Sequence, residues 1–249
     1  MFIMEVTYKT QGIILQREQY GENDSRVFVY TSDFGKLELV ARGTQKLSSK
    51  LAAHLEPLNL CEIMVVRGKQ YDYLGTAISE EVFAGIKDDY DKTTVAGEIL
   101  KLVNEVTKEK QAEQAIFLLL KEFFSILNDV ETRHGASLLE ILFSAFTLKF
   151  LSLLGYAPQL ERCVVCQKTI ELDNNKFSFS HGGMVCKMCN APDSVAISNE
   201  AVKIMRLALT PNWQEILKLT IPNELRTETG RLATQFKEYC LVDFLRQKR

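Results

Sequence analysis

The chain has 249 residues, 46% of them hydrophobic, and 30 basic against 32 acidic side chains give a formal net charge of −2. This length and apolar content are enough for at least two packed cores. The nearly balanced charge gives no global attraction to nucleic acid or to anionic membranes, so any polyanion site must be local. Residues 1–5 lack the basic head of a secretory signal, and the most apolar stretches, 116–127 and 138–156, contain charged residues. We therefore expect a cytoplasmic protein without a membrane segment.

The first third of the chain has the two-residue period of β-strands. Candidate strands cover residues 11–16, 26–31, 36–41, 60–67 and 71–79. Turn-forming residues separate them, and only the link from 42 to 59 is long. Five strands with one long connection after the third are typical of an OB-type β-barrel, a fold that often binds single-stranded nucleic acid. An SH3-like barrel is the alternative.

Basic residues gather after the second candidate strand. Lys36, Arg42, Lys46 and Lys50 fall within fifteen residues that contain a single acid, Glu38. The candidate DNA-binding residues are Arg42, Lys46, Lys50, Lys36, Arg26 and Arg17, with Arg67 as a weaker addition. Aromatic residues that could stack on bases are Tyr20, Tyr30, Phe34, Tyr71 and Tyr73. Solvated lysines and core-filling aromatics explain the same pattern equally well, so the residues alone leave DNA binding open.

After residue 88 the period changes to that of α-helices. Residues 94–107, 111–128 and 137–154 are predicted to form three long helices, with Asp91 or Thr93 as the first N-cap. Gly155 is positioned to end the third helix. Two more helices are expected over 200–209 and 224–246, with Ser198 and Asn223 as their N-caps.

Four cysteines are grouped as two C-x2-C pairs, Cys163 with Cys166 and Cys186 with Cys189, separated by 19 residues. This spacing is that of a zinc ribbon, and residues 176–185 between the pairs have the pattern of a hairpin with a His-Gly-Gly turn. Four thiolates would saturate one Zn²⁺ and leave no position for water, so we expect a structural ion and not a catalytic one. Redox dithiols, unligated thiols and a site in which His181 replaces one thiolate are the alternatives.

Enzyme signatures are weak in this chain. His54-Leu55-Glu56 matches the H-x-E of zinc deaminases, but the residues before the two pairs are Arg162 and Val185, where that motif needs proline. Loops that bind ATP or a dinucleotide are also missing from the sequence. We expect no enzyme, and we expect Cys61 and Cys240 to be buried as small apolar residues.

Three segments together resemble the RecO family of bacterial recombination mediators. Residues 12–15, 20–22 and 31–43, ending in Ala41-Arg42-Gly43, are similar to the family's first barrel strands and the start of its basic loop. Residues 150–158, which lead into Cys163, resemble its junction between helix and zinc motif, and the step from Gly182-Gly183 to Cys186 also fits. One departure is Gln167, where family members often have glycine after the second cysteine.

The resemblance implies an α+β protein with an OB-type barrel (1–81), a helical domain in two parts (82–160 and 198–249) and an inserted zinc motif of four cysteines (161–197). It further implies a non-enzymatic protein of the nucleoid that binds single- and double-stranded DNA and anneals complementary strands. With RecR, such a protein helps to load RecA onto strands coated by single-strand-binding protein. By the motif match, Arg42, Lys46 and Lys50 are the main DNA contacts. A zinc-ribbon adaptor that binds proteins and not DNA is the alternative, followed by a zinc hydrolase.

Overall fold

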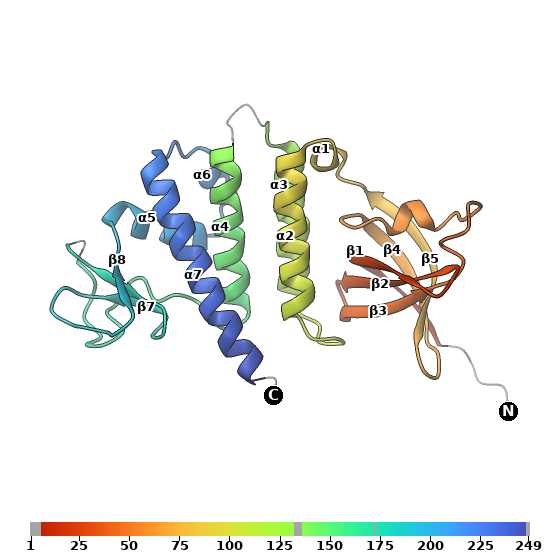
Figure 1. The fold of residues 1–249 in the computed structure, drawn as a ribbon, viewed down its shortest axis with the longest axis horizontal. Coiled ribbons are helices and arrows are strands. Elements are labelled where there is room, and N and C mark those ends of the chain that lie inside the picture. The colour runs from red at the N-terminus through yellow and green to blue at the C-terminus, as the bar shows by residue number, and fades with distance from the viewer. Residues whose placement is uncertain (1–5, 132–135, 172, 248–249) are drawn as a thin grey trace. The chain divides into compact units, whose positions relative to one another are not determined.

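The computed structural model describes residues 6–131, 136–171 and 173–247, and its fold is drawn in Figure 1. The chain forms two compact units that meet in sequence between Val130 and Glu131. Among the described helices, none combines the length and apolar character that a bilayer span requires. The expectation about a secretory signal concerns residues 1–5, which lie outside the described residues.

The first unit begins with a closed five-stranded barrel, as predicted (Figure 1). Its strands, in the order β1-β2-β3-β5-β4, are β1 (Thr7–Tyr20), β2 (Asp24–Thr31), β3 (Gly35–Ala41), β4 (Leu60–Val66) and β5 (Asp72–Glu81). All neighbouring pairs are antiparallel except β3 and β5, which run parallel and close the barrel. This strand order and the long link after β3 confirm the OB-type fold.

Strand β1 is longer than expected because it serves two neighbours. Its first half pairs with β4 and its second half with β2, and the register shifts between Ile14 and Gln16. Such a bulge increases the local twist and lets one strand bend around a small barrel. Alternate residues of the strands point inward, where Val27, Leu39 and Ile63 are fully buried in the barrel core.

Three helices follow the barrel and belong to the same unit: α1 (Ala84–Lys87), α2 (Tyr90–Val106) and α3 (Gln114–Asp129). Helix α2 begins earlier than expected, and its N-cap is neither Asp91 nor Thr93. The Asp89 carboxylate accepts the cap hydrogen bond from the Lys92 backbone N–H at 3.0 Å. Both expected caps lie inside the helix, whereas Asp89 has the extended backbone of a residue that precedes a helix.

The connection between α2 and α3 is bound to the turn end of the β2–β3 hairpin. The buried Tyr30 hydroxyl donates to the Glu113 carbonyl at 3.2 Å, and the Lys110 backbone N–H donates to the Lys36 carbonyl at 2.9 Å. Because barrel and helices share these contacts, the domain border expected after residue 81 falls inside the first compact unit.

The second unit combines a helical group with a small sheet. Its helices are α4 (Ala136–Leu153), α5 (Asn199–Leu209), α6 (Trp213–Leu217) and α7 (Asn223–Gln247), and its strands are β6 (Lys176–Ser178), β7 (Gly183–Val185) and β8 (Ser194–Ala196). The sheet order is β7-β6-β8, so the predicted hairpin is confirmed, and β8 was not expected. Phe177 of β6 meets Phe236 of α7 edge to face, with ring centroids 5.6 Å apart, which fixes the hairpin to the helices.

The ends of these helices test three further expectations. Gly155 follows α4 with φ of +91°, and the Ser198 hydroxyl accepts from the Ala201 N–H at 3.1 Å at the start of α5, so both predicted caps are confirmed. Asn223, in contrast, is the first residue of α7 and not the residue before it. The preceding Pro222 instead contributes its carbonyl to the Arg226 N–H.

We expect Gly35→Ala to lower the free energy of unfolding of the first unit by about 2 to 4 kcal/mol. Gly35 has φ of +67°, and an added methyl group would collide with the backbone of Gln111 in the α2–α3 connection. Gly21→Ala is the matched control, because Gly21 has φ of +68° but open space around it; it should lose only about 1 kcal/mol. Urea denaturation measures both, and equal losses would show that the contact with Gln111 is unimportant.

Candidate metal centre and nucleic-acid interface

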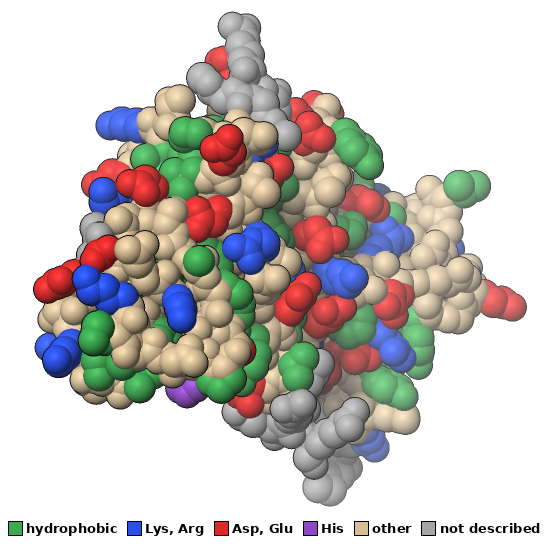
Figure 2. All heavy atoms as spheres, turned by 60° about the vertical axis from the view of Figure 1, so that its left-hand side comes forward, with side chains coloured by type: hydrophobic (Ala, Val, Ile, Leu, Met, Phe, Trp, Pro, Cys, Tyr) green, Lys and Arg blue, Asp and Glu red, His purple; other side chains and the backbone are tan. Residues whose placement is uncertain are grey.

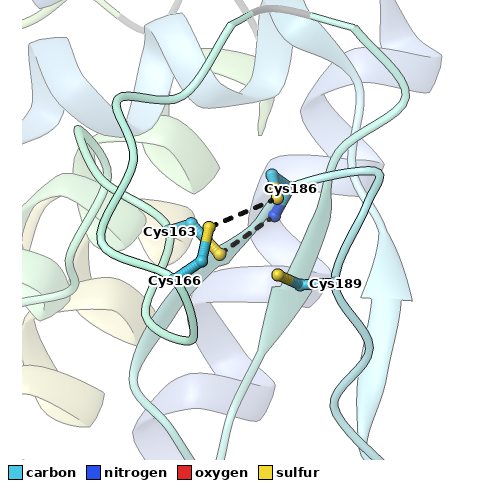
Figure 3. Close-up of side chains that lie close together, drawn as sticks. All are labelled: Cys163, Cys166, Cys186 and Cys189. Atoms are coloured by element: carbon cyan, nitrogen blue, oxygen red, sulfur yellow. Dashed lines mark hydrogen bonds between the residues drawn. The ribbon is translucent and has the colours of Figure 1, made fainter.

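The four cysteines of the two C-x2-C pairs converge on one point (Figure 3). Their Sγ atoms all lie within 4.8 Å of one another, although the two pairs are separated by the whole hairpin. Cys163 is buried, Cys186 and Cys189 are half-buried, and Cys166 is exposed. Four sulfur donors at this spacing could hold one metal ion.

Backbone pairing brings the two pairs together. Strands β6 and β7 place the second pair directly after the hairpin, and the Val164 N–H donates to the Met184 carbonyl at 2.8 Å, joining the first pair to β7. The Cys186 N–H also points at the Cys163 Sγ at 3.4 Å. Backbone hydrogen bonds of the hairpin and of Val164 therefore bring the four cysteines together without a bound metal.

The protonation of the cluster shows why a cation suits it. Burial raises the pKa of Cys163, but the backbone N–H groups of Cys166, Cys186 and Val165 outweigh that effect and lower it to about 6. The thiols of Cys166 and Cys186 raise the pKa of Cys189 to about 12. Four thiolates this close together would repel one another, and a bound cation would compensate their charge.

Gln167, in the turn after the first cysteine pair, adopts a backbone conformation that is usual for glycine. Its φ is +62°, in the left-handed region that favours glycine. Its N–H donates to the Cys163 carbonyl at 2.9 Å, and the Cys163 N–H in turn donates to the Lys168 carbonyl at 2.8 Å. The departure from the family's usual glycine is therefore accommodated as local strain in the turn, with the four ligands still in place.

Neither histidine considered as a ligand lies in the cluster. The Nδ1 atom of His181 is 3.0 Å from the Ser178 hydroxyl, which also donates to the Asp193 carboxylate. The Nδ1 atom of His54 accepts from the Ser79 N–H at 3.1 Å and so holds the 3-10 helix η1 (Ala52–Leu55) against β5. These bonds explain the two histidines as structural residues of the loop and the barrel.

Cys61 and Cys240 are buried, as expected. Burial raises the pKa of both thiols, that of Cys240 to about 12. A protonated, enclosed thiol is a poor nucleophile and a poor metal ligand, so these two residues act as small apolar side chains.

A surface of aromatic rings and guanidinium groups lies on the barrel; we call it the aromatic–arginine surface. Its members are Tyr20, Arg26, Arg42, Tyr71 and Tyr73. The Arg42 guanidinium lies 4.4 Å from the Tyr73 ring centroid, and that of Arg26 lies 5.0 Å from Tyr20. The rings of Tyr20 and Tyr71 approach edge to face at 6.4 Å. Stacked arginines keep their charge while presenting a flat apolar face, which suits contact with both phosphates and bases.

The barrel register assembles this surface from distant segments. Val40 of β3 lies opposite both Arg26 on β2 and Tyr73 on β5, which brings Arg42 beside Tyr73. The Arg26 guanidinium also pairs with Glu38 at 3.0 Å, so its charge is partly compensated. Arg42 is the exposed cation of the surface.

The segment 42–50, which we call the basic loop, continues from this surface. Lys46 and Lys50 are exposed on it. Its base is fixed, because the buried Thr44 hydroxyl donates to Ser25 at 2.7 Å and the Gly43 N–H donates to the Asp24 carboxylate at 2.8 Å. Arg42, Lys46 and Lys50 therefore share one anchored loop.

Two other predicted DNA contacts are engaged within the protein. The Lys36 ammonium donates to the Asn104 carbonyl at 2.6 Å near the end of α2, where a cation offsets the helix dipole. Arg17 has a side chain only 15% exposed; it pairs with Glu56 at 3.0 Å and donates to the Thr44 carbonyl at 3.1 Å. In this structure both residues support the framework, and Arg17 supports the basic loop itself.

The aromatic residues considered for base stacking fall into a packed group and an accessible group. Tyr30 is 1% exposed, and Phe34 packs on Tyr8 with ring centroids 4.3 Å apart. Tyr71 is exposed, and Tyr20 and Tyr73 are half-buried. Sequence patterns provide no means of separating these groups, because the α2–α3 connection that covers Tyr30 comes from a distant part of the chain.

The face drawn in Figure 2 has mixed charge. Figure 2 shows acidic and basic side chains interspersed on the face that it displays. This agrees with the net charge of −2 and limits any polyanion site to a local feature such as the basic loop.

Comparison with known families decides the relationship. A family model described as "Recombination protein O N terminal" matches residues 4–82, and one described as "Recombination protein O C terminal" matches residues 87–249. The chain belongs to the RecO family. The two matches meet near the end of the barrel, although the compact units divide the chain later, at residue 130.

Curated RecO relatives match along nearly their full length. "DNA repair protein RecO" of Alkaliphilus metalliredigens is 28% identical over 94% of this chain and 92% of its own length. The proteins of the same name from Caldanaerobacter subterraneus and Syntrophus aciditrophicus are 28% and 29% identical, over 95% and 94% of this chain. As a member of the RecO family, this chain is a DNA repair protein.

We expect the purified chain to hold one equivalent of a thiolate-binding metal ion, and Cys166→Ser to lose it. Loss of one of four ligands should also lower the melting temperature of the second unit, since the metal joins the two cysteine pairs. His181→Ala is the control and should keep the metal. Elemental analysis together with thermal unfolding measures both effects. Full metal content in Cys166→Ser, or loss of metal in His181→Ala, would contradict this ligand set.

Proposed function

We propose that this RecO-family protein is a non-enzymatic DNA-binding mediator of recombinational repair. It binds single- and double-stranded DNA, anneals complementary strands and, with RecR, helps to load RecA onto strands coated by single-strand-binding protein. It works in the cytoplasm at the nucleoid. The observation that carries this proposal is the aromatic–arginine surface next to an anchored basic loop on an OB-type barrel.

Single strands suit the aromatic–arginine surface for a physical reason. Unpaired bases expose π-faces, and stacking on an aromatic side chain contributes about 1 to 3 kcal/mol per base. Tyr71 and Tyr73 offer such rings, and Arg42 adds a charge for the phosphates beside Tyr73. Stacking of this kind tolerates any base, as a repair mediator requires.

Annealing requires that the charge of two strands be neutralised while their bases stay available for pairing. The basic loop can neutralise phosphates through Arg42, Lys46 and Lys50 without reading base edges. The reaction is downhill once repulsion is reduced, so it needs no ATP. This agrees with a site built only from charge and aromatic surface.

For the metal, we propose Zn²⁺ bound by Cys163, Cys166, Cys186 and Cys189. Four sulfur donors within 4.8 Å suit a tetrahedral zinc ion, and a closed set of four leaves no position for a reacting water. The ion would join the two cysteine pairs around the hairpin and have a structural role.

The two parts of the DNA surface should respond differently to salt. If about four phosphates are contacted, log K for a single strand falls with log salt at a slope of about −3, and Lys46→Gln with Lys50→Gln should reduce that slope. Tyr71→Ala should weaken binding by roughly tenfold and leave the slope unchanged, since it removes stacking and no charge. Fluorescence anisotropy over a salt series measures both. Absence of binding at low salt would overturn the DNA-binding proposal.

Strand annealing tests the whole proposal. We expect the protein to speed annealing of bare strands and, with RecR present, to act on strands coated by single-strand-binding protein. The variant with Lys46→Gln and Lys50→Gln should anneal strands more slowly, because it loses two phosphate contacts, while its fold should persist, since both positions are exposed. If annealing is not accelerated by the wild-type chain while DNA is bound, the mediator function is wrong and a simpler binding role replaces it.

A further inference from the structure

The basic loop exposes a leucine at its tip. Leu47 is 109% exposed relative to a reference peptide, more than any other large hydrophobic residue in the described part of the chain; Tyr90 and Met188, at 85%, come next. Single exposed apolar residues are common on protein surfaces, so exposure alone does not indicate a function. Leu47 differs from such residues because its loop is held by hydrogen bonds and carries three cations.

The base of the loop is anchored, which keeps Leu47 away from the barrel core. Thr44 is buried and bonded to Ser25, and the Gln45 N–H donates to the Asn23 carbonyl at 2.9 Å. Beyond this anchor the Lys46 N–H donates to the Gly43 carbonyl and the Ser49 N–H to the Lys46 carbonyl. These turns hold the tip in a defined shape with its apolar side chain pointing into solvent.

The charged residues near Leu47 in sequence are all cations. From residue 39 to residue 55 the chain contains Arg42, Lys46 and Lys50 and no acidic residue. An apolar tip among cations matches a ligand with a negatively charged exterior and an apolar interior. Duplex DNA has this character, because its phosphates surround a stack of bases.

We propose that Leu47 is a wedge that inserts between neighbouring base pairs of duplex DNA held by the basic loop. This inference rests on the proposed DNA binding and deepens it. Proteins that kink duplexes commonly insert a leucine, isoleucine, phenylalanine or methionine between base steps, while cations nearby hold the phosphates. An aliphatic wedge suits a duplex step, whereas the tyrosines of the aromatic–arginine surface suit the flat faces of unpaired bases.

The wedge and the aromatic–arginine surface are neighbours. The Gln45–Asn23 bond holds the loop beside the turn after Tyr20, and Arg42 connects the loop to Tyr73. The barrel can therefore hold a duplex at the loop and a single strand at the aromatic rings at the same time. This arrangement fits the boundary between paired and unpaired DNA, which is where annealing proceeds.

The test uses the full chain, a short A·T-rich duplex and Leu47→Ser. Permanganate oxidises thymines that have lost their stacking, so it reports a wedge at any position along the duplex. We expect wild-type protein to increase thymine reactivity and Leu47→Ser to abolish the increase. Duplex affinity should fall by roughly tenfold through loss of one buried leucine contact, with single-strand affinity unchanged.

Two matched variants complete the test. Leu118→Ser changes a leucine that is 53% exposed on α3 and should leave reactivity at the wild-type level, whereas Leu47→Met keeps an apolar wedge and should retain the increase. Duplex binding by wild type without increased reactivity, or an increase retained by Leu47→Ser, overturns the wedge and leaves the proposed function standing. Failure of wild type to bind any DNA overturns the proposed function and the wedge with it.

Discussion

Closure of the barrel depends on a short parallel contact between β3 and β5. Only Leu39 with Asp72 and Val40 with Tyr73 are paired there, whereas the antiparallel pairs extend over many residues. This contact brings Tyr73 next to Arg42, the residue at which the chain leaves β3 and enters the basic loop. Parallel pairing over so few residues is weak by itself, so the loop's own anchors at Thr44 and Arg17 support the same region.

In the second unit, contacts between side chains stabilise the small three-stranded sheet. Its three-stranded sheet has strands of three residues each, too short to be stable without further support. Two contacts stabilise it: the edge-to-face packing of Phe177 on Phe236, and the convergence of four thiols that a metal ion can join. A few local contacts therefore hold the basic loop in the first unit and the small sheet in the second.

Two of the basic residues predicted to contact DNA are bound within the protein instead. Lys36 caps a helix end, and Arg17 holds the backbone of the basic loop. The charge left for a ligand is small and concentrated in Arg42, Lys46 and Lys50, in keeping with a net charge of −2. In the DNA-binding role that we propose, a local cationic loop beside aromatic rings would give binding without a strong field over the whole molecule, which would favour release of a strand after pairing.

Local patterns in the sequence were enough to predict the five strands, the long helices, the cap at Ser198 and the four-cysteine group, because each depends on residues close together in the chain. They could not select Asp89 over Asp91 and Thr93 as a cap, since that choice depends on where the backbone becomes extended before α2. Nor could they separate Tyr30 from Tyr73, or Lys36 from Lys46. Folding assigns those roles through distant segments. The α2–α3 connection covers Tyr30, and the Asn104 carbonyl of α2 binds the Lys36 ammonium, whereas β5 brings Tyr73 beside Arg42.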